Sequence, residues 1–350
     1  MENELRIKRE NLAEFIKNVL SAVKVPEGQA IDTAEILVKA HLRGYDTHGL
    51  PCLAGYVAAL EEGRLNPTPS LEVKGSRKWA SQVDGDNGLG QVAGTKAMRL
   101  CLEAADAFGI GITTVKRSNH FGAASAFSLR ALEHDCIGIV ASNASAVTAP
   151  FGAAEPLFGT NPLSVAIPAE SMPPFVIDMA TSAGSRKKIR KALDEGKTIP
   201  AGWSLDQNGE PTIDPAAALK GVMLPFGGAK GSAITTLVDI LSGVMSGAEF
   251  GGRVLSVATN HARESGNGNF MMAIKTDLFM PTQEFRLRMD QELRHIIALT
   301  PANGFSEVMY PGYRAHAVEK ERTLEGIPFA AGQIEKARTI GRKYGVSFPS

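Results

Sequence analysis

Two histidines lie in glycine-containing segments where an imidazole could exchange a proton. His48 follows a predicted helix in Asp46-Thr47-His48-Gly49, and His120 follows a predicted strand in Asn119-His120-Phe121-Gly122. Because histidine changes its charge near neutral pH, either ring could act as a general acid or base. Each segment taken alone is more often a capping turn with an exposed histidine, so the two indicate catalysis only in combination with other features.

One carboxylate interrupts an apolar run at Val176-Ile177-Asp178-Met179-Ala180, which reads as a strand. Burying a carboxylate costs free energy unless the group is paired or hydrogen-bonded. We therefore expect Asp178 to have a specific partner, such as a histidine or backbone amides. A functional role and a purely structural role both remain open from this feature.

Several cations and polar turns could hold the phosphates of a ligand. Arg186-Lys187-Lys188 and the turn 227–231, which contains Lys230, place cations near glycines. The turn 158–162 places Asn161 between Thr160 and a proline, in a stretch with almost no charged residues. The alternatives are a solvated basic cluster for the cations and an ordinary buried loop for the turn.

Several familiar cofactor and metal motifs are missing from the chain. Gly88-Leu-Gly90-Gln-Val-Ala-Gly94 departs from GxGxxG because its third glycine is one residue late, and no acidic residue follows about 20 residues later. Cys52, Cys101 and Cys136 are scattered and form no CxxC pair, which predicts reduced thiols and no metal cluster. The residues alone therefore indicate an α/β enzyme with a phosphate-bearing cofactor and no Rossmann fingerprint.

The elements that must position these residues follow two patterns. Residues 1–65 are predicted to be helical, and 64–70 is a turn-rich linker. Beyond the linker, strands alternate with helices, which predicts an α/β or α+β domain. The predicted strands are 112–115, 137–141, 163–167, 175–179 and 270–274, and the predicted helices are 89–108, 123–134, 232–245 and an amphipathic segment from 282 to 299.

Composition narrows the possible partners. The 350 residues carry 37 basic and 37 acidic side chains, so the formal net charge is zero. Nucleic acid and anionic membranes both attract a basic excess, so neither is expected as a partner. The charged N-terminal segment has no apolar core of a signal peptide, and we expect a cytoplasmic protein.

Eight segments, taken together and in order, resemble the malate/L-lactate dehydrogenase-like family of NAD(P)-dependent oxidoreductases, which differs from the Rossmann lactate and malate dehydrogenases. The resemblance covers the chain from about residue 12 to 330. The segments are RGYDTHGL (43–50), DGDNGLGQ (84–91), NHFGAAS (119–125), FGTNPLSVAIP (158–168), IDMATS (177–182), IPAGWSLDQNGEPTIDP (199–215), GGAKGSA (227–233) and YPGYR (310–314).

The resemblance implies a fold, a cofactor and an assembly. A mixed-sheet α/β domain at residues 71–284 would bind NAD or NADP without a GxGxxG motif. A helical domain would combine residues 1–70 with the segment from about 285 to 350. Members of the family are usually homodimers, with the active site in the cleft between the domains and close to the subunit interface.

The resemblance also implies roles for individual residues. His48 matches the acid/base histidine, Thr47 matches a hydroxyl beside it, and Asp178 matches the acid that completes a proton relay. His120 matches a substrate-pocket histidine, with Tyr56, Arg43 and Cys52 as further substrate-binding candidates. The cofactor-binding candidates are Asn161, Ile177, Asp178, Met179, Ala180, Thr181, Ser182, Ala183, Ala229, Lys230, Gly312, Tyr313 and Arg314.

Cys52 departs from the family pattern. Many members carry an arginine four residues after the catalytic histidine, apparently to hold the substrate carboxylate, and a thiol cannot form its paired charge-assisted bonds. Arg43, Tyr56 and Arg117 are the alternative holders. The expected substrate is a small 2-hydroxy or 2-oxo acid, and the alternatives are reduction of a C=N bond in a cyclic imino acid and a catalytically idle cofactor-binding homologue.

Overall fold

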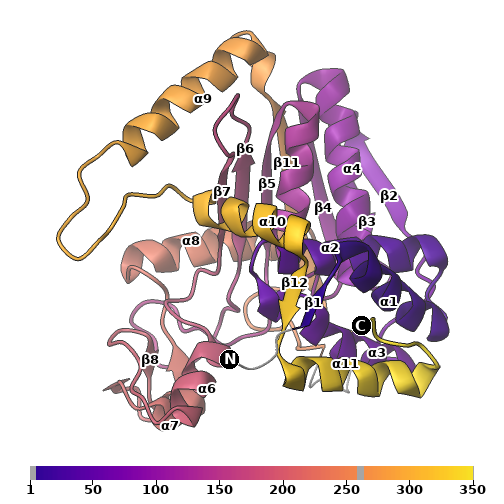
Figure 1. Ribbon diagram of the computed structural model, residues 1–350, viewed down its shortest axis with the longest axis vertical. Coiled ribbons are helices and arrows are strands. Elements are labelled where there is room, and N and C mark those ends of the chain that lie inside the picture. The colour runs from indigo at the N-terminus through magenta and orange to yellow at the C-terminus, as the bar shows by residue number, and fades with distance from the viewer. Residues whose placement is uncertain (1–4, 258–263, 350) are drawn as a thin grey trace.

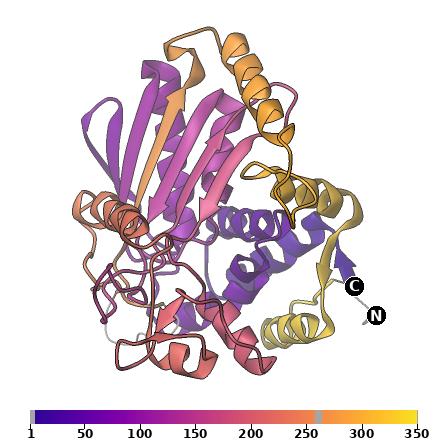
Figure 2. The same cartoon turned by 90° about the vertical axis from the view of Figure 1, so that its left-hand side faces the viewer.

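A seven-stranded mixed sheet runs through the middle of the molecule (Figures 1 and 2) in a computed structural model that describes residues 5–257 and 264–349. Only β3 and β4 are parallel, and every other neighbouring pair is antiparallel. The expected α/β fold with a mixed, non-Rossmann sheet is confirmed. The strand order is β2 (Glu72–Arg77), β3 (Ala80–Asp84), β4 (Ile110–Ser118), β11 (Asn267–Lys275), β5 (Cys136–Ser142), β6 (Leu163–Ile167) and β7 (Phe175–Met179).

Helices cover both faces of the sheet. Successive side chains of β11 point to opposite faces, and because both sets are apolar, each face needs a helix to cover it. Met271 packs into a core with α4 (Gly90–Phe108), whereas Phe270 packs with α8 (Ala229–Asp239). The predicted helix at 232–245 is thus α8 followed by one π-helical turn, Ile240–Val244. The predicted helix at 123–134 is a short α5 (Ser125–Ser128) followed by a 3-10 helix, Leu129–His134.

The glycines at 88–94 serve close packing around α4. A Cβ atom on Gly90 would lie 2.2 Å from the carbonyl oxygen of Asn119, so only glycine lets the helix start against the segment that carries His120. A Cβ atom on Gly94 would likewise lie 2.8 Å from the Phe127 ring. These contacts explain the repeated glycines without a dinucleotide turn.

The two ends of the described chain share a second core. β1 (Leu5–Ile7) pairs antiparallel with β12 (Ile327–Phe329), and α11 (Ala331–Tyr344) packs on α1 (Arg9–Ala22). The apolar stripe of α1 supplies Leu12, Phe15, Ile16, Val19 and Leu20 to this core. The remaining helices of this part are α2 (Glu27–Leu42), α3 (Leu53–Glu61) and α10 (Tyr313–Glu325).

Helix α9 (Thr282–Ile297) lies apart from that terminal core, near one end of the sheet (Figure 1). Its buried Asp290 accepts hydrogen bonds from the backbone N–H groups of residues 170–172. The C-terminal residues that pack in the terminal core lie between 327 and 348.

A small lobe, which the sequence patterns did not predict, projects below the sheet in Figure 1. Ile189, Ile199, Ala218 and Met223 form a separate small core there. Its elements are α6 (Arg186–Asp194), β8 (Ser204–Leu205), β9 (Pro211–Thr212), α7 (Pro215–Lys220) and β10 (Val222–Met223). None of the helices within the described ranges is long and apolar enough to cross a membrane.

Candidate active site

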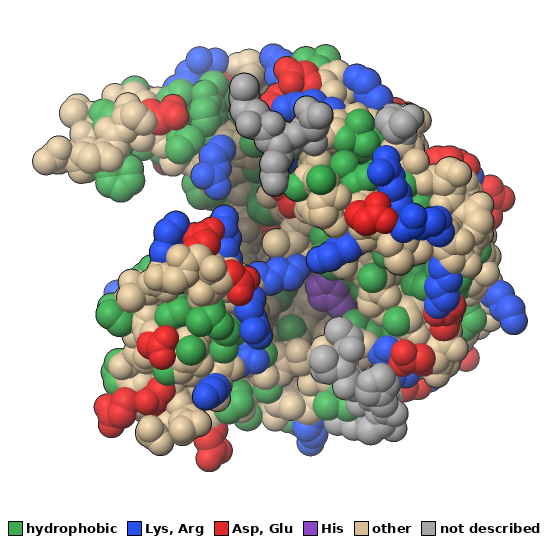
Figure 3. All heavy atoms as spheres, turned by 60° about the horizontal axis from the view of Figure 1, so that its bottom comes forward, with side chains coloured by type: hydrophobic (Ala, Val, Ile, Leu, Met, Phe, Trp, Pro, Cys, Tyr) green, Lys and Arg blue, Asp and Glu red, His purple; other side chains and the backbone are tan. Residues whose placement is uncertain are grey.

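A deep hollow opens on one face of the molecule (Figure 3), with lysine and arginine side chains on its walls and a histidine visible inside it. A hydrogen bond from Lys187 Nζ on α6 to the Thr47 carbonyl oxygen, at 2.8 Å, links the small lobe to the N-terminal segment. The segment 46–52, which carries His48, forms two 3-10 turns, Asp46–His48 and Leu50–Cys52.

A buried histidine fixes the conformation of these turns. His41 Nδ1 lies 2.9 Å from Asp46 Oδ1, and its Nε2 accepts the Leu50 N–H at 2.9 Å. Because Nε2 is an acceptor, the ring carries its proton on Nδ1 and donates it to Asp46. Arg322 of α10 donates to the same carboxylate at 2.6 Å. Burial opposes ionisation of Asp46, but the bonds from His41 and Arg322 outweigh it and lower its pKa to about 2.

His48 projects from this turn and is open to solvent. Its Nδ1 lies 2.9 Å from Thr47 Oγ1. The surrounding walls desolvate the ring enough to lower its pKa, and the positive charge of Lys187 lowers the pKa further. His48 is therefore a neutral base at pH 7. In the tautomer that donates Nδ1–H to Thr47, its Nε2 is the atom that accepts a proton.

His120 stands beside His48, with ring centroids 5.9 Å apart and planes inclined by 20°. The Tyr56 hydroxyl lies 2.6 Å from His120 Nδ1 and accepts a hydrogen bond from Gln91 Nε2 at 2.8 Å. With Gln91 as donor, the Tyr56 hydroxyl is free to give its own proton to Nδ1, and in that arrangement the neutral His120 ring carries its N–H on Nε2. Burial, followed by the charges of His48 and Lys187, lowers the pKa of His120 to about 3.

Asp178 has one of the partners expected for a buried carboxylate. Its Oδ2 accepts the backbone N–H of Ser125 at 3.1 Å. Burial raises its pKa, and the bonds from Ser125 and the charge of Arg43 oppose that rise. No hydrogen bond joins Asp178 to His48 among the described residues, so the relay expected between them is not formed by direct contact.

The arginines considered as carboxylate holders are engaged elsewhere. Arg43 is buried and donates to Glu319 at 2.7 Å, although its Nε and Nη2 have no hydrogen-bond partner within the described ranges. Arg117 is bound to Glu264 at 3.0 Å and Asp84 at 3.1 Å.

Cys52 belongs to the same group of side chains as His48, His120 and Tyr56, which we call the histidine cluster. Its thiol contacts the Thr47 carbonyl oxygen at 3.5 Å. Burial raises the pKa of that thiol, so it is neutral at pH 7 and offers no charge to an acid.

The three segments predicted to contact the cofactor converge at β7. Phe226 N–H donates to the Thr181 carbonyl at 3.0 Å, and Ala183 N–H donates to the Leu224 carbonyl at 2.8 Å. These bonds bring residues 177–183 next to the start of α8, which carries Ala229 and Lys230. The segment 310–314 follows, because a Cβ atom on Gly312 would lie 2.8 Å from the backbone nitrogen of Val176.

Asn161 is placed differently from the other cofactor candidates. Its side chain is fully buried, donates to the Thr235 carbonyl at 3.2 Å and accepts the Ala144 N–H at 3.2 Å. Its side chain therefore ties α8 to the sheet, and it can serve a cofactor only by shaping the turn.

A cavity of about 770 Å³ adjoins this convergence and has the size and chemistry for part of a dinucleotide. Trp203, Phe226 and Phe151 supply aromatic surface for a base. The start of α8, with Gly227 and Gly228 at positive φ, presents backbone N–H groups of the kind that bind phosphate. The residues present thus fit a nicotinamide dinucleotide, although no GxGxxG turn contributes.

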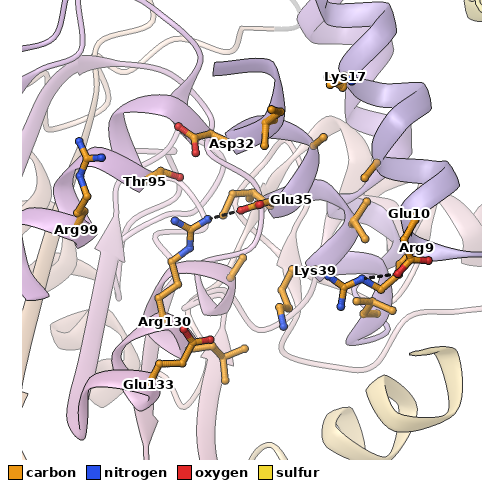
Figure 4. Close-up of a pocket in the computed structure, with 18 of the residues that line it drawn as sticks. Arg9, Glu10, Lys17, Asp32, Glu35, Lys39, Thr95, Arg99, Arg130 and Glu133 are labelled. Atoms are coloured by element: carbon orange, nitrogen blue, oxygen red, sulfur yellow. Dashed lines mark hydrogen bonds and ion pairs between the residues drawn. The ribbon is translucent and has the colours of Figure 1, made fainter. Parts of the chain in front are cut away.

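A second hollow, of about 1010 Å³, lies between α1, α2, α4 and the 3-10 helix at 129–134 (Figure 4). Acidic and basic side chains alternate around it, and Arg130 is paired with Glu35 at 3.2 Å. None of the site residues predicted from the sequence lines it, so it is separate from the histidine cluster.

Sequence reasoning missed three groups that the fold brings to the site. Gln91 was part of the quoted DGDNGLGQ segment but had no assigned role, and Lys187 was noted only as part of a basic cluster. His41, Asp46 and Arg322 position the His48 turn from α2 and α10, and no local pattern links residues 276 positions apart.

The chain matches the family model described as malate/L-lactate dehydrogenase over residues 7–337. It is 39% identical over 306 residues to L-sulfolactate dehydrogenase of Methanocaldococcus jannaschii, covering 87% of this chain and 88% of that protein. It is 34% identical to the (2R)-3-sulfolactate dehydrogenase (NADP(+)) of Chromohalobacter salexigens, covering 92% and 95%. It is 32% identical to the ureidoglycolate dehydrogenase (NAD(+)) of Escherichia coli K12, covering 92% of each chain.

The solved structure of the sulfolactate dehydrogenase from Methanocaldococcus jannaschii superposes with a TM-score of 0.92 at 36% identity, over 98% of both chains. The fold of this chain is thus the fold of a solved dehydrogenase. The chain belongs to the malate/L-lactate dehydrogenase family, a family of NAD(P)-dependent dehydrogenases.

Proposed function

We propose that this protein uses NAD or NADP to interconvert a small 2-hydroxy acid and the corresponding 2-oxo acid. The observation that carries the proposal is His48, a neutral imidazole held by Thr47 and open to a cleft beside a second neutral imidazole, His120. Relatives named for sulfolactate, malate and ureidoglycolate support a hydroxy acid as the substrate class.

The bound cofactor would supply or accept the hydride, and the protein would orient the substrate and move the proton. During oxidation, His48 takes the hydroxyl proton on Nε2, while Thr47 holds the other ring nitrogen. During reduction, the same atom returns the proton to the developing alkoxide. His120 donates its Nε2–H to a substrate oxygen, and Tyr56 with Gln91 fixes that tautomer.

Asp178 remains the candidate acid at the far end of the relay. Its raised pKa allows it to hold a proton closer to neutral pH than an ordinary aspartate does. Because no direct bond reaches His48, we expect a water molecule or a substrate atom to complete the path. Arg43 Nε and Nη2 have no hydrogen-bond partner among the described residues, so Arg43 is the candidate on this side of the site for binding an anionic group of the cofactor.

For the cofactor, we assign the cavity lined by Trp203 and Phe226 to the adenosine part, and the start of α8 with Lys230 to the phosphates. Residues 177–183 and Gly312, Tyr313 and Arg314 would line the rest of the dinucleotide. Thermal denaturation with NADH and with NADPH distinguishes the two cofactors, because a ligand at 100 times its Kd adds about 2.7 kcal/mol of stability.

The experiment that tests the function is a substrate panel with both cofactors. Malate, lactate, sulfolactate and ureidoglycolate are assayed for oxidation, and a cyclic imino acid is assayed for reduction. Oxidation of any hydroxy acid above the imine rate supports the proposal. Activity on the imine alone favours a C=N reductase, and cofactor binding without turnover favours an idle homologue.

We also propose a homodimer, because one segment exposes much apolar surface. Phe279 is 92% exposed, Leu299 63% and Phe305 72%, and all three flank or follow α9. Apolar side chains concentrated on one projecting segment are typical of a protein–protein interface. Light scattering after size-exclusion chromatography tests this proposal.

A cytoplasmic location is proposed on the cysteines. Cys52, Cys101 and Cys136 are all free thiols. Unpaired thiols are typical of proteins in a reducing compartment. Fractionation of cells that express the protein checks this assignment.

A further inference from the structure

We propose that Lys187 binds the acidic group of the substrate across the cleft, in place of a cation at position 52. This inference rests on the proposed function, since it names the residue that would select an anionic substrate at the same site. It starts from the hydrogen bond between Lys187 Nζ and the Thr47 carbonyl at 2.8 Å, one residue from the proposed base.

Lys187 and the proposed base lie on opposite sides of the cleft. Lys187 belongs to α6 in the small lobe, whereas Thr47 and His48 belong to the N-terminal segment. The hydrogen bond therefore brings an ammonium group from one side of the cleft to the backbone on the other side. It reaches the segment 46–52 that carries His48, which we call the catalytic turn. A lysine ammonium has three N–H donors, and one donor on the Thr47 carbonyl leaves two for a ligand.

The charge of Lys187 reaches the residues of the site. The positive charge of Lys187 acts on His48, His120 and Cys52, and it lowers the pKa of each. Lys187 is thus the cation that these three groups have in common. An anion placed between the two imidazoles would therefore meet this ammonium, and it would meet no carboxylate that already neutralises it.

The arginines near the site already have carboxylate partners. The charge of the buried Arg43 is paired with Glu319, although two of its nitrogens are unbonded, and Arg117 is bound to Glu264 and Asp84. Cys52 is held neutral by burial. Lys187 is solvent-exposed apart from its bond to Thr47, so its ammonium can pair with a carboxylate or sulfonate without breaking an ion pair.

The test uses the full-length enzyme and four proteins: the wild type, Lys187→Ala, Lys187→Arg and Lys191→Ala. Lys191 lies one helical turn further along α6 and pairs with the exposed Glu195 at 3.6 Å, so it controls for loss of charge on the same helix. Two quantities are measured: the Kd of oxalate, an unreactive dianion, for the enzyme with NADH or NADPH, and KM with kcat for the hydroxy acid that is oxidised fastest. The melting temperature of each variant checks its folding. Because Lys187 is exposed, its replacement should leave the melting temperature unchanged.

Lys187→Ala is expected to raise the oxalate Kd and the substrate KM by about tenfold to a hundredfold, with a smaller change in kcat. Lys187→Arg should recover most of the affinity, and Lys191→Ala should behave as the wild type. An oxalate Kd within twofold of wild type in Lys187→Ala, or no oxalate binding by the wild type, overturns the inference. If the wild type oxidises no hydroxy acid but binds oxalate through Lys187, the anion site stands and only the proposed reaction fails.

Discussion

At the scale of single residues, the proposed chemistry depends on two imidazoles that are both neutral at pH 7 but for different reasons. His48 is exposed to solvent, and desolvation and Lys187 lower its pKa, whereas His120 is only partly exposed and is bonded to Tyr56. The exposed ring of His48 is free to exchange a proton with a substrate, and the bond to Tyr56 holds the His120 ring in a fixed direction. This difference assigns proton transfer to His48 and orientation to His120.

A prediction follows for the pH dependence of oxidation. Oxidation requires neutral His48, and desolvation and Lys187 lower its pKa below the ordinary value of 6.5. The acidic limb of kcat/KM for hydroxy acid oxidation should therefore lie below pH 6.5. Lys187→Ala removes one of the two causes and should move the limb to higher pH. Steady-state rates between pH 4.5 and 9, measured on both proteins, check the position of the limb.

A second residue-scale prediction concerns Tyr56. Tyr56→Phe removes the donor to His120 Nδ1 and leaves Gln91 Nε2 without its acceptor. We expect kcat/KM to fall by about tenfold to a hundredfold, since a lost bond to a buried polar group costs roughly 1–3 kcal/mol. Gln91→Leu should give a smaller loss, because His120 keeps its partner. Equal rates in Tyr56→Phe and the wild type would contradict the role given to His120.

At the scale of elements, the catalytic turn is held from two sides. His41 at the end of α2 binds Asp46 and the Leu50 N–H, and Arg322 of α10 binds the same aspartate. The hydrogen bonds from His41 and Arg322 lower the pKa of Asp46 to about 2. Ionised Asp46 therefore stabilises the fold above the pKa of an unfolded aspartate, near 3.9, and this stabilisation is lost as the pH falls toward 2. The turn should therefore keep its shape over the working range of the enzyme.

Gly49→Ala tests how tightly this turn is packed. A Cβ atom at this position would lie 2.2 Å from His41 Cδ2, and the His41 ring cannot move away because both of its nitrogens are bonded. We expect a loss of about 1–3 kcal/mol in the free energy of unfolding, together with a lower kcat. Denaturant unfolding measures the first quantity. Gly28→Ala is the control, because nothing lies within 4 Å of its Cβ position and the variant should be as stable as the wild type.

Elements were easier to predict than contacts. β6 and β7 occupy the predicted ranges because their apolar and β-branched residues form short, bounded runs. The two-residue strands β8, β9 and β10 carry no periodicity that a sequence could reveal. The pairing of β1 with β12 and the Lys187–Thr47 bond join residues far apart in sequence, so neither follows from any local pattern.

At the scale of the whole molecule, the cleft is built by three parts of the chain that fold around different cores. The sheet carries His120 and Asp178, the terminal helices carry His48, and the small lobe carries Lys187. Motif order identified the first two groups, since RGYDTHGL and NHFGAAS each contain a histidine of the cluster. No substrate-binding side chain was predicted in the small lobe. The position of Lys187 at the site depends on how the lobe packs across the cleft, which no local sequence pattern reveals.

The proposed dimer gives a prediction at the same scale. Phe305→Lys places a charge in the apolar segment that follows α9, where the phenylalanine is 72% exposed. If that segment contacts a second copy, the variant should shift toward a monomer in light scattering. Ile213→Lys, at a side chain that is 52% exposed in the small lobe, is the matched control and should leave the mass unchanged. A wild type that is monomeric at micromolar concentration would contradict the dimer.

The central claim is that His48 transfers the substrate proton while the cofactor transfers the hydride. The most direct test compares the wild type with His48→Ala for reduction of NAD⁺ and NADP⁺ by the best hydroxy acid, with cofactor binding measured separately by calorimetry. The account predicts a kcat lower by about 10²–10⁴-fold with the cofactor Kd unchanged. A variant that keeps the wild-type kcat, at any pH where the wild type is active, would contradict it.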